Sequence, residues 1–252
     1  MSLVLFALDA GIARMTLNRP EKRNALNQEM IAAIRDALAS AAVNPDVRVV
    51  LIAGAGKDFC AGLDLLALDR GADAGVLDHM ETARQLADIY LAIRRHPRPI
   101  LAAVQGRALG GGMGLATAAD LCIAAESAQF GYPEVKIGFV PAIVAALLRR
   151  SVSEKRMFEL LATGDPVSST RAAEIGLINR VFPDAGFESS AATYAANLAS
   201  KSASALSLTK SLLEHTDSMP LEKAIEAGVR ANALARMTED AQRGFEAFQK
   251  KR

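Results

Sequence analysis

Apolar and polar residues alternate in two short stretches near the start of the chain, at 4–8 and 12–17. Alternation with a period of two is typical of half-buried strands, and the turn residues at 9–11 between them predict a hairpin. Asn27 then stands where a helix N-cap is expected. Apolar residues recur at helical spacing from there to Ala41, which predicts one amphipathic helix.

Short apolar runs and helical patterns alternate through the middle of the chain. The runs are bounded by polar or turn residues, as expected for buried strands. The segment from about 64 to 80 is acidic, Gly-rich and weakly periodic, so we expect it to be mobile. The predicted elements are strands at 47–53, 100–104 and 121–125, and helices at 78–95 and from the glycine run to 119.

After Pro141 the pattern is mainly helical. Helices are expected near 141–149, 153–162, 168–175, 187–213, 220–236 and 239–250. Strand–turn–helix units followed by helices predict an α/β fold with a helical C-terminal part. We expect a core over 1–195 and a helical oligomerisation region over 196–252, because apolar stripes in the last helices suit packing against another subunit.

Composition narrows the function classes. Hydrophobic residues make up 51% and charged residues 23%, which is typical of a soluble globular protein. A net charge of +1 argues against nucleic-acid or membrane-surface partners. Cys60 and Cys122 have neither metal-ligand nor disulfide spacing, so no metal site is expected. Without a leader pattern or a membrane-spanning apolar run, a cytoplasmic location is expected.

A run of glycines, Gly110-Gly111-Gly112-Met113-Gly114, follows the apolar run at 100–104 and opens a helical pattern. Glycine lets the backbone approach a ligand closely, and a helix that begins there presents free N–H groups. Such a site binds an anion or an oxyanion with backbone atoms alone. The run matches neither a phosphate-binding loop nor a dinucleotide fingerprint. Close packing of a helix on a strand is the alternative explanation.

Two other segments add to this candidate site. The segment from Asp58 to Leu65 contains Gly62 and follows another apolar run, so a second backbone N–H can reach the same oxygen. The segment from Phe130 to Gly138 places Glu134 in a turn-rich stretch of mostly uncharged residues. A structural carboxylate in a turn is the alternative interpretation of this glutamate.

Together these segments resemble the crotonase family, the enoyl-CoA hydratase/isomerase superfamily. The motifs are Asn18-Arg19-Pro20 with Arg23-Asn24-Ala25-Leu26, Phe59 to Leu65, Ala108 to Gly112, and Phe130-Gly131 with Pro133-Glu134 and Gly138. Each is weak alone, but their order and spacing fit along nearly the whole chain. The resemblance implies a spiral of ββα turns with a helical trimerisation region, in a homotrimer or a dimer of trimers.

The resemblance also implies which residues act. Family members bind acyl-CoA thioesters, so coenzyme A belongs to the substrate and no separate cofactor is implied. They hold the thioester oxygen with two backbone N–H groups, which by position belong to Leu63 and Gly111, and Glu134 is the acid and base. The residues implied to bind substrate are Arg23, Ala25, Leu26, Ala61, Gly62, Asp64, Leu65, Gly110, Gly114, Pro133 and Phe248.

Among these, Arg23, Ala25 and Leu26 match the region along the CoA phosphates and pantetheine. The adenine-side loop is matched by Ala61, Asp64 and Leu65. Phe248 and Lys251 are expected to reach the CoA of a neighbouring subunit.

One position departs from the family pattern. Hydratases of this family use two glutamates, and Gly114 stands where the first one belongs. Two carboxylates share the activation of water and the protonation of carbon in the usual hydratase. Moving a double bond from the 3- to the 2-position needs one base, so the chemistry favours isomerisation. The glycine run through Leu115 and the segment from Phe130 to Ala142 resemble instead a bacterial subgroup described as enoyl-CoA or methylglutaconyl-CoA hydratases.

We therefore expect an enoyl-CoA hydratase of fatty acid metabolism. A 3-enoyl-CoA to 2-enoyl-CoA isomerase that uses Glu134 alone is the first alternative, followed by other thioester chemistry such as decarboxylation or hydrolysis. A non-catalytic acyl-CoA-binding protein is a further alternative because one carboxylate is missing, whereas scattered basic residues disfavour RNA binding. We also expect the small Gly114 to leave room for a branched or bulky acyl group.

Overall fold

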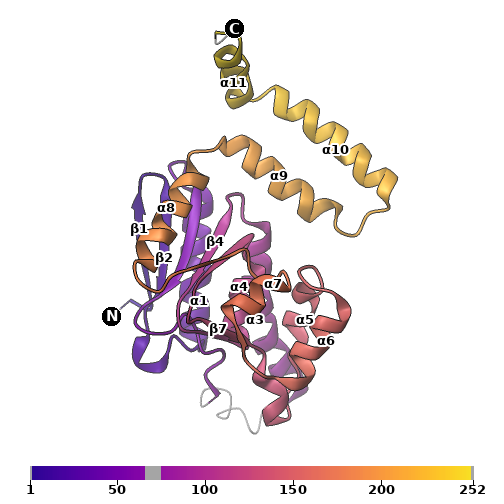
Figure 1. Cartoon of the computed structure of the whole chain (residues 1–252). Helices are drawn as coiled ribbons and strands as arrows, with labels where there is room; N and C mark the ends of the chain where they lie inside the picture. Colours follow the sequence, from indigo (N-terminus) through magenta and orange to yellow (C-terminus); the bar gives the residue numbers. More distant parts are fainter. Residues whose placement is uncertain (1, 66–74, 251–252) are drawn as a thin grey trace.

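The main sheet of the molecule has six strands (Figure 1). It belongs to a computed structural model that describes residues 2–65 and 75–250. The strand order is β1-β2-β3-β4-β6-β9, and every pairing after the β1–β2 hairpin is parallel. The strands are β1 (Val4–Asp9), β2 (Ile12–Leu17), β3 (Val49–Gly54), β4 (Ile100–Val104), β6 (Leu121–Ala125) and β9 (Arg180–Phe182). The hairpin and the three central strands confirm the prediction of an α/β fold.

Helices cover both faces of this sheet, because successive residues of a buried strand point to opposite sides. On one face, Ile52 packs in a core shared with α1 (Gln28–Val43) and α3 (Val76–Arg95). On the other face, Leu51 packs in a separate cluster with α8 (Phe187–Ala199). The two clusters explain why the central strands read as unbroken apolar runs.

A second sheet of three short strands lies beside the glycine run. Its order is β5-β7-β8, with β5 (Arg107–Leu109), β7 (Gln129–Gly131) and β8 (Val167–Ser168). The sequence patterns do not predict this sheet, because strands of two or three residues leave no periodicity. Helix α4 (Gly111–Ala118) follows β5, and the 3₁₀ helix η2 (Pro133–Ile137) follows β7. The small sheet therefore sets the starting points of both elements.

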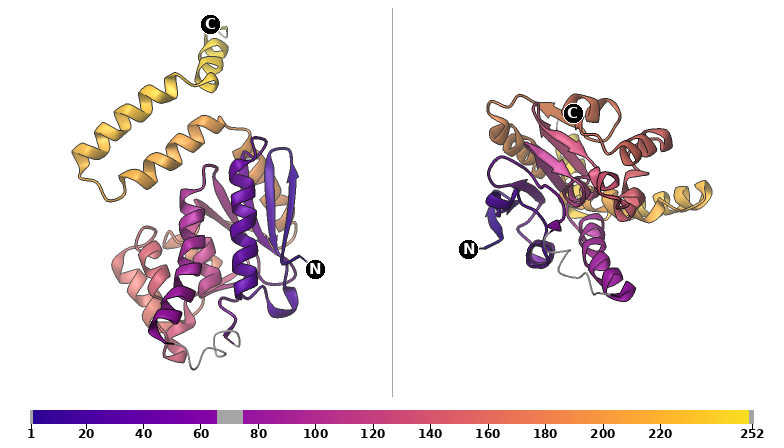
Figure 2. Two further views of the ribbon diagram at one scale, coloured as in Figure 1. Left: turned by 180° about the vertical axis from the view of Figure 1, so that it is seen from behind. Right: turned by 90° about the horizontal axis from the view of Figure 1, so that it is seen from below.

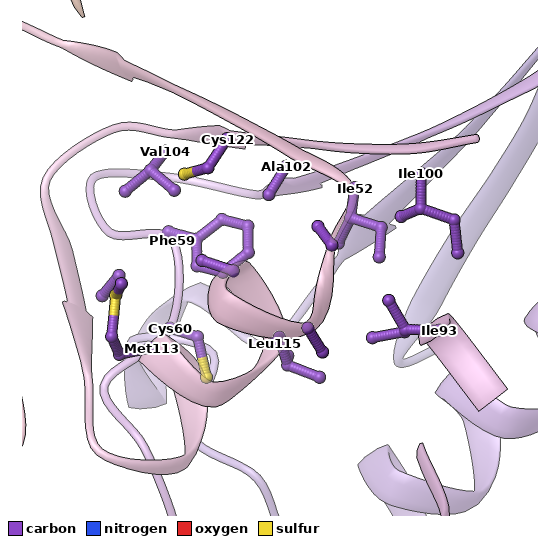
Figure 3. Close-up of a cluster of buried hydrophobic side chains, with 14 of the residues drawn as sticks. Ile52, Phe59, Cys60, Ile93, Ile100, Ala102, Val104, Met113, Leu115 and Cys122 are labelled. Carbon is purple, nitrogen blue, oxygen red and sulfur yellow. The ribbon is translucent and has the colours of Figure 1, made fainter. Parts of the chain in front are cut away.

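One hydrophobic cluster anchors the loop after β3 and the glycine helix together (Figure 3). The fully buried ring of Phe59 lies among Ile52, Ala102 and Val104 of the central strands. Met113 of α4 packs in the same cluster. The loop after β3 and α4 are thus fixed to a common core.

The second half of the chain is helical as predicted, with one correction. The expected single helix over 187–213 is wrong, since α8 ends at Ala199 and α9 (Ala203–Thr216) begins after Ser202. The Ser202 hydroxyl accepts a hydrogen bond from the Ala205 N–H and caps the new helix. The remaining elements of the body are η1 (Pro20–Lys22), α5 (Ala142–Leu148), α6 (Glu154–Thr163) and α7 (Ser169–Glu174).

The last helices, α10 (Leu221–Arg236) and α11 (Glu239–Gln249), stand away from the sheets as an arm (Figures 1 and 2). Helix α10 packs against α9. Lys210 of α9 ties this region to the body, with Nζ donating to Ile93 O at 2.9 Å and to Asp120 Oδ2 at 2.7 Å. The division at residue 195 stays a prediction.

Within the part of the chain that the structure describes, no helix is long and apolar enough to cross a membrane. Of the segment expected to be mobile, residues 66–74 lie outside the described residues. Its last residues form the start of α3 at Val76.

Candidate active site

The glycine run is shaped by a close approach to Glu134. Gly110 has φ +50°, a conformation that L side chains rarely adopt, and a Cβ there would lie 3.1 Å from Glu134 Oε1. The Gly110 N–H donates to Gly131 O at 2.9 Å, which ties β5 to the strand before η2. Helix α4 then begins at Gly111, so the first-turn N–H groups start directly beside the carboxylate.

The loop after β3 runs parallel to β5 and reaches the same place. Cys60 forms a parallel bridge with Ala108, and the Leu109 N–H donates to Cys60 O at 3.0 Å. Gly62 has φ +99°, and a Cβ there would lie 2.9 Å from Leu109 O and 3.5 Å from Gly111 N. Only a residue without a side chain allows the two backbones to approach this closely.

Two backbone amides remain free where these loops meet. Among the residues that the structure describes, neither the Leu63 N–H nor the Gly111 N–H donates a hydrogen bond to a protein acceptor. Leu63 Cγ would lie 3.5 Å from a Cβ on Gly111, so the two residues are neighbours. Free buried donors are rare in folded proteins and call for an acceptor from a ligand. The pair has the character of an oxyanion hole, with the Gly111 amide at a helix N-terminus.

Glu134 places its carboxylate against the glycine run, with both of its oxygens within 4 Å of the position that a Cβ on Gly110 would take. It lies in the first turn of η2, after Pro133, and its Oε2 is buried without a hydrogen-bond partner among the described residues. Burial raises the pKa of this carboxyl above its usual value of 4.5. A carboxylate with a free oxygen and a raised pKa is suited to take up and return a proton.

The space beside Gly114 is occupied by Tyr90 of α3. A Cβ at Gly114 would overlap Tyr90 Oη and Cζ and would lie 2.8 Å from Val144 Cγ1. The expectation that Gly114 leaves room for a larger acyl group is therefore wrong. The aromatic ring fills that volume, and Tyr90 is 1% exposed.

The loop at 19–26 closes the other side of the site. The Leu26 N–H donates to Gly62 O at 2.8 Å, and the Asp64 N–H donates to Leu26 O at 2.9 Å. Arg19 Nη1 pairs with Asp64 Oδ2 at 2.8 Å, and Arg23 lies exposed in this loop. The structure therefore brings together the predicted residues of this loop and of the loop after β3.

The buried Asn24 holds these loops in place, although its role was not predicted. Its side-chain N–H₂ donates to Asp58 O at 2.8 Å, to Phe59 O at 3.1 Å and to Ala55 O at 3.0 Å. Its Oδ1 accepts from the Arg19 N–H at 2.9 Å. An Asn inside a turn-rich motif was the available signal, since Asn tolerates the positive φ of 55° found here.

One predicted residue lies far from the others within a single chain. Phe248 is on α11, at the end of the arm that stands away from α5 and α6 (Figure 1). Lys251 lies outside the described residues. Leu65 is exposed at the edge of the described segment. Within residues 2–65 and 75–250, no group of three or more His, Cys, Asp or Glu side chains could hold a metal ion.

Comparisons with known proteins identify the family of the chain. The family model described as enoyl-CoA hydratase/isomerase matches residues 7–252. A Thermus thermophilus protein provisionally named enoyl-CoA hydratase is 39% identical over 241 residues, which cover 96% of this chain and 95% of that protein.

Two solved structures have the same fold. The crystal structure of an enoyl-CoA hydratase of Mycobacterium smegmatis superposes with a TM-score of 0.94 at 32% identity, covering 99% of this chain and 97% of the other. Human enoyl Coenzyme A hydratase domain-containing protein 3 gives a TM-score of 0.94 at 29% identity, with 99% and 98% covered. The chain therefore belongs to the enoyl-CoA hydratase/isomerase family, the crotonase family.

Proposed function

We propose that this protein is an enoyl-CoA hydratase, which reversibly adds water across the double bond of a 2-enoyl-CoA thioester. The observation that carries the proposal is Glu134, whose buried Oε2 has no partner among the described residues and whose carboxylate borders Gly110. The names of the relatives support hydration. Coenzyme A is part of the proposed substrate, and no separate cofactor is needed.

In the forward reaction, Glu134 takes a proton from water while the water oxygen bonds to C3 of the enoyl group. The electron pair of the double bond moves toward the thioester carbonyl and gives an enolate. The Leu63 and Gly111 N–H groups stabilise the negative oxygen, and such a donor contributes about 3–4 kcal/mol in comparable sites. Glu134 then returns its proton to C2, which regenerates the carboxylate and completes the addition.

Isomerisation of a 3-enoyl-CoA to a 2-enoyl-CoA is the second candidate. The specific observation that favours it is the absence of a side chain at Gly114, where Tyr90 takes up the volume. In this reaction Glu134 removes a proton from C2 and delivers it to C4, and the same two amides hold the dienolate oxygen. One carboxylate is sufficient for both proton transfers.

We further propose that coenzyme A lies along the loop at 19–26 and the loop after β3. The residues proposed there are Arg23, Ala25, Leu26, Ala61, Gly62, Asp64 and Leu65, with Gly110, Gly114 and Pro133 nearer the acyl group. A homotrimer, or a dimer of trimers, would bring Phe248 of one subunit toward the CoA of another. Its 63% exposure on the arm leaves it accessible for such a contact.

A paired assay tests the proposal. Crotonyl-CoA is followed by loss of the conjugated thioester absorbance, and a 3-enoyl-CoA is followed by its gain. Loss in the first assay supports a hydratase that works with Glu134 as its glutamate. Gain in the second without loss in the first supports the isomerase and contradicts hydration. Silence in both, repeated with branched and aromatic acyl-CoA substrates, would favour a non-catalytic acyl-CoA-binding protein.

A further inference from the structure

Tyr90 is a buried polar residue whose hydroxyl has one specific partner at the site. It lies on α3, and its Oη donates to Gly111 O at 2.7 Å inside the core. The acceptor is a carbonyl, which has no proton, so the tyrosine must be the donor. Burial raises the pKa of Tyr90 well above its usual value of 10.0, which keeps the proton on the hydroxyl over the whole range of working pH.

The Gly111 carbonyl belongs to the residue that also supplies an oxyanion-hole amide. Gly110, Gly111 and Gly112 have no side chains to restrict their backbone torsions. An oxyanion hole works because its donors are held in place before the reaction. The hydrogen bond from the Gly110 N–H to Gly131 O holds the backbone before the Gly111 amide, and the backbone after it needs a restraint as well. A hydrogen bond to the Gly111 carbonyl fixes the peptide plane between Gly111 and Gly112. It thereby restricts the ψ torsion of Gly111, which connects this plane to the Cα that carries the oxyanion-hole amide.

The ring of Tyr90 also decides which residue is possible at position 114. Because a Cβ at Gly114 would overlap the end of this ring, a glutamate there cannot coexist with the observed position of Tyr90. Tyr90 and Gly114 therefore form a matched pair. The Tyr90 hydroxyl, which donates to Gly111 O, occupies the volume that the side chain of a glutamate at position 114 would need.

We infer that Tyr90 is a positioning residue, which fixes the Gly111 N–H for the thioester oxygen through the Gly111 carbonyl and keeps the site to one carboxylate. The inference rests on the proposed function in one respect, namely that a thioester oxygen is the ligand of the Leu63 and Gly111 amides. It assigns Tyr90 no contact with substrate.

The experiment compares wild type with Tyr90→Phe, which keeps the ring and removes the donor. Each protein is mixed with butyryl-CoA carrying ¹³C at the thioester carbonyl, and the C=O stretch of the bound ligand is recorded by difference infrared spectroscopy. Polarisation by two well-placed amides lowers this frequency. In Tyr90→Phe the band is expected to move back toward its position in free butyryl-CoA. On the substrate that the wild type turns over, kcat is expected to fall about tenfold with KM nearly unchanged, less than the loss on removal of a donor itself.

Tyr132→Phe is the matched control. Tyr132 is equally buried, and its Oη shares a hydrogen bond with Thr117 Oγ1 at 2.8 Å. Among the described residues, the side chain that donates to the Gly111 carbonyl is that of Tyr90, not Tyr132. It should lose stability without moving the carbonyl band. An identical band in wild type and Tyr90→Phe would overturn the inference. Because the ligand is not turned over, the infrared result stands even if no enoyl-CoA proves to be a substrate, which would count against the proposed function alone.

A second measurement applies if Tyr90→Phe does not fold. Biosynthetic 3-fluorotyrosine replaces the three tyrosines of the chain and makes each hydroxyl a stronger donor. If Tyr90 positions the Gly111 amide, fluorination should move the carbonyl band of bound butyryl-CoA further from the band of free butyryl-CoA. Fluorination of the Tyr132→Phe variant should move the band by the same amount. An unmoved band would contradict a positioning role.

Discussion

At the scale of single residues, the site is built from polar groups that have no hydrogen-bond partner among the described residues. Within residues 2–65 and 75–250, Glu134 has a buried oxygen without a partner, and the amides of Leu63 and Gly111 donate to no protein acceptor. Unpartnered buried polar groups are costly, so folded proteins keep few of them. Their gathering beside two positive-φ glycines indicates that a ligand completes their hydrogen bonds.

Glu134 should give the reaction an acidic limb in its pH profile. The carboxyl must be ionised to accept a proton, and burial raises its pKa above 4.5. The rate kcat/KM is therefore expected to rise with pH through a midpoint above 4.5, and to lose this limb in Glu134→Gln. A pH–rate profile with a substrate whose own groups do not titrate in this range measures it. A midpoint at or below 4.5 would show that burial does not control this group.

Glu134, Leu63 and Gly111 could be named from the sequence because each stands in a motif that resembles one of the crotonase family, and their roles remain predictions. Tyr90 could not be named in the same way. It recurs with Leu86, Ile89 and Ile93 as one of four buried positions on α3, so the pattern predicts burial and nothing about the hydroxyl. Its partner, Gly111 O, is 21 residues away and is chosen by tertiary packing alone.

At the scale of elements, the packing of α3 on α4 predicts that position 114 tolerates no side chain. Gly114→Ala is expected to lower the free energy of unfolding by about 1–3 kcal/mol, because its Cβ overlaps the Tyr90 ring. In a Tyr90→Leu background the same change should cost less, since the overlap with Tyr90 Oη and Cζ is gone and only the close approach to Val144 Cγ1 at 2.8 Å remains. Urea unfolding of the four proteins measures this coupling.

Gly228→Ala in α10 is the matched control for that cycle. No heavy atom lies within 4 Å of the place of its Cβ, and the residue is inside a helix. Alanine should stabilise the helix there by about 0.5–1 kcal/mol. Equal effects of Gly114→Ala with and without Tyr90 would contradict the overlap.

Lys210 is expected to hold α9 on the body. The Lys210 side chain is 8% exposed, and its ammonium donates to two backbone carbonyls and to Asp120 Oδ2. In Lys210→Met all three of these hydrogen bonds are lost, and the partly buried Asp120 carboxylate loses its cationic partner. Breaking a buried pair of this kind costs about 3–5 kcal/mol. Lys223→Met, from a pair whose lysine is 71% exposed, should change stability by less than about 1 kcal/mol. Similar unfolding free energies for both variants would refute the assignment.

The element predictions succeeded where a local pattern of apolar residues or a cap marks the element. Long apolar runs and helices with clear caps were predicted, as for α1, where the Asn27 side chain accepts from Met30 N at 2.9 Å. The strands β5, β7 and β8 were missed because pairing with distant residues, rather than a local pattern, makes them strands. The break between α8 and α9 was missed because Ser202 interrupts the apolar pattern no more than an exposed helical serine would.

At the scale of the whole molecule, the arm formed by α10 and α11 exposes apolar side chains that a single chain does not bury. On α10, Ile225 is 59% exposed and Val229 is 65% exposed, one turn apart on the same face. Apolar faces of this kind mark protein interaction sites. The proposed trimer would cover this face and bring Phe248 toward a neighbouring site.

Ile225→Asp is expected to weaken that assembly. The molar mass of the wild type should be about three or six times the chain mass of 26.6 kDa. The molar mass of the variant should fall toward that of a single chain at low protein concentration. Light scattering coupled to size-exclusion chromatography measures the masses. Val43→Asp, which changes an 83% exposed residue at the end of α1, is the control and should leave the mass unchanged. A wild type of one chain mass would contradict the proposed oligomer.

The central claim is that Glu134 moves the protons of an enoyl-CoA reaction. Glu134→Gln preserves the shape of the side chain and removes its basicity, so the most direct measurement compares its turnover with its binding of butyryl-CoA. Turnover of the active enoyl-CoA should fall by about 10²–10⁴-fold, while the Kd for butyryl-CoA stays close to that of the wild type. Retained turnover in a protein that still binds butyryl-CoA would show that another group does this work.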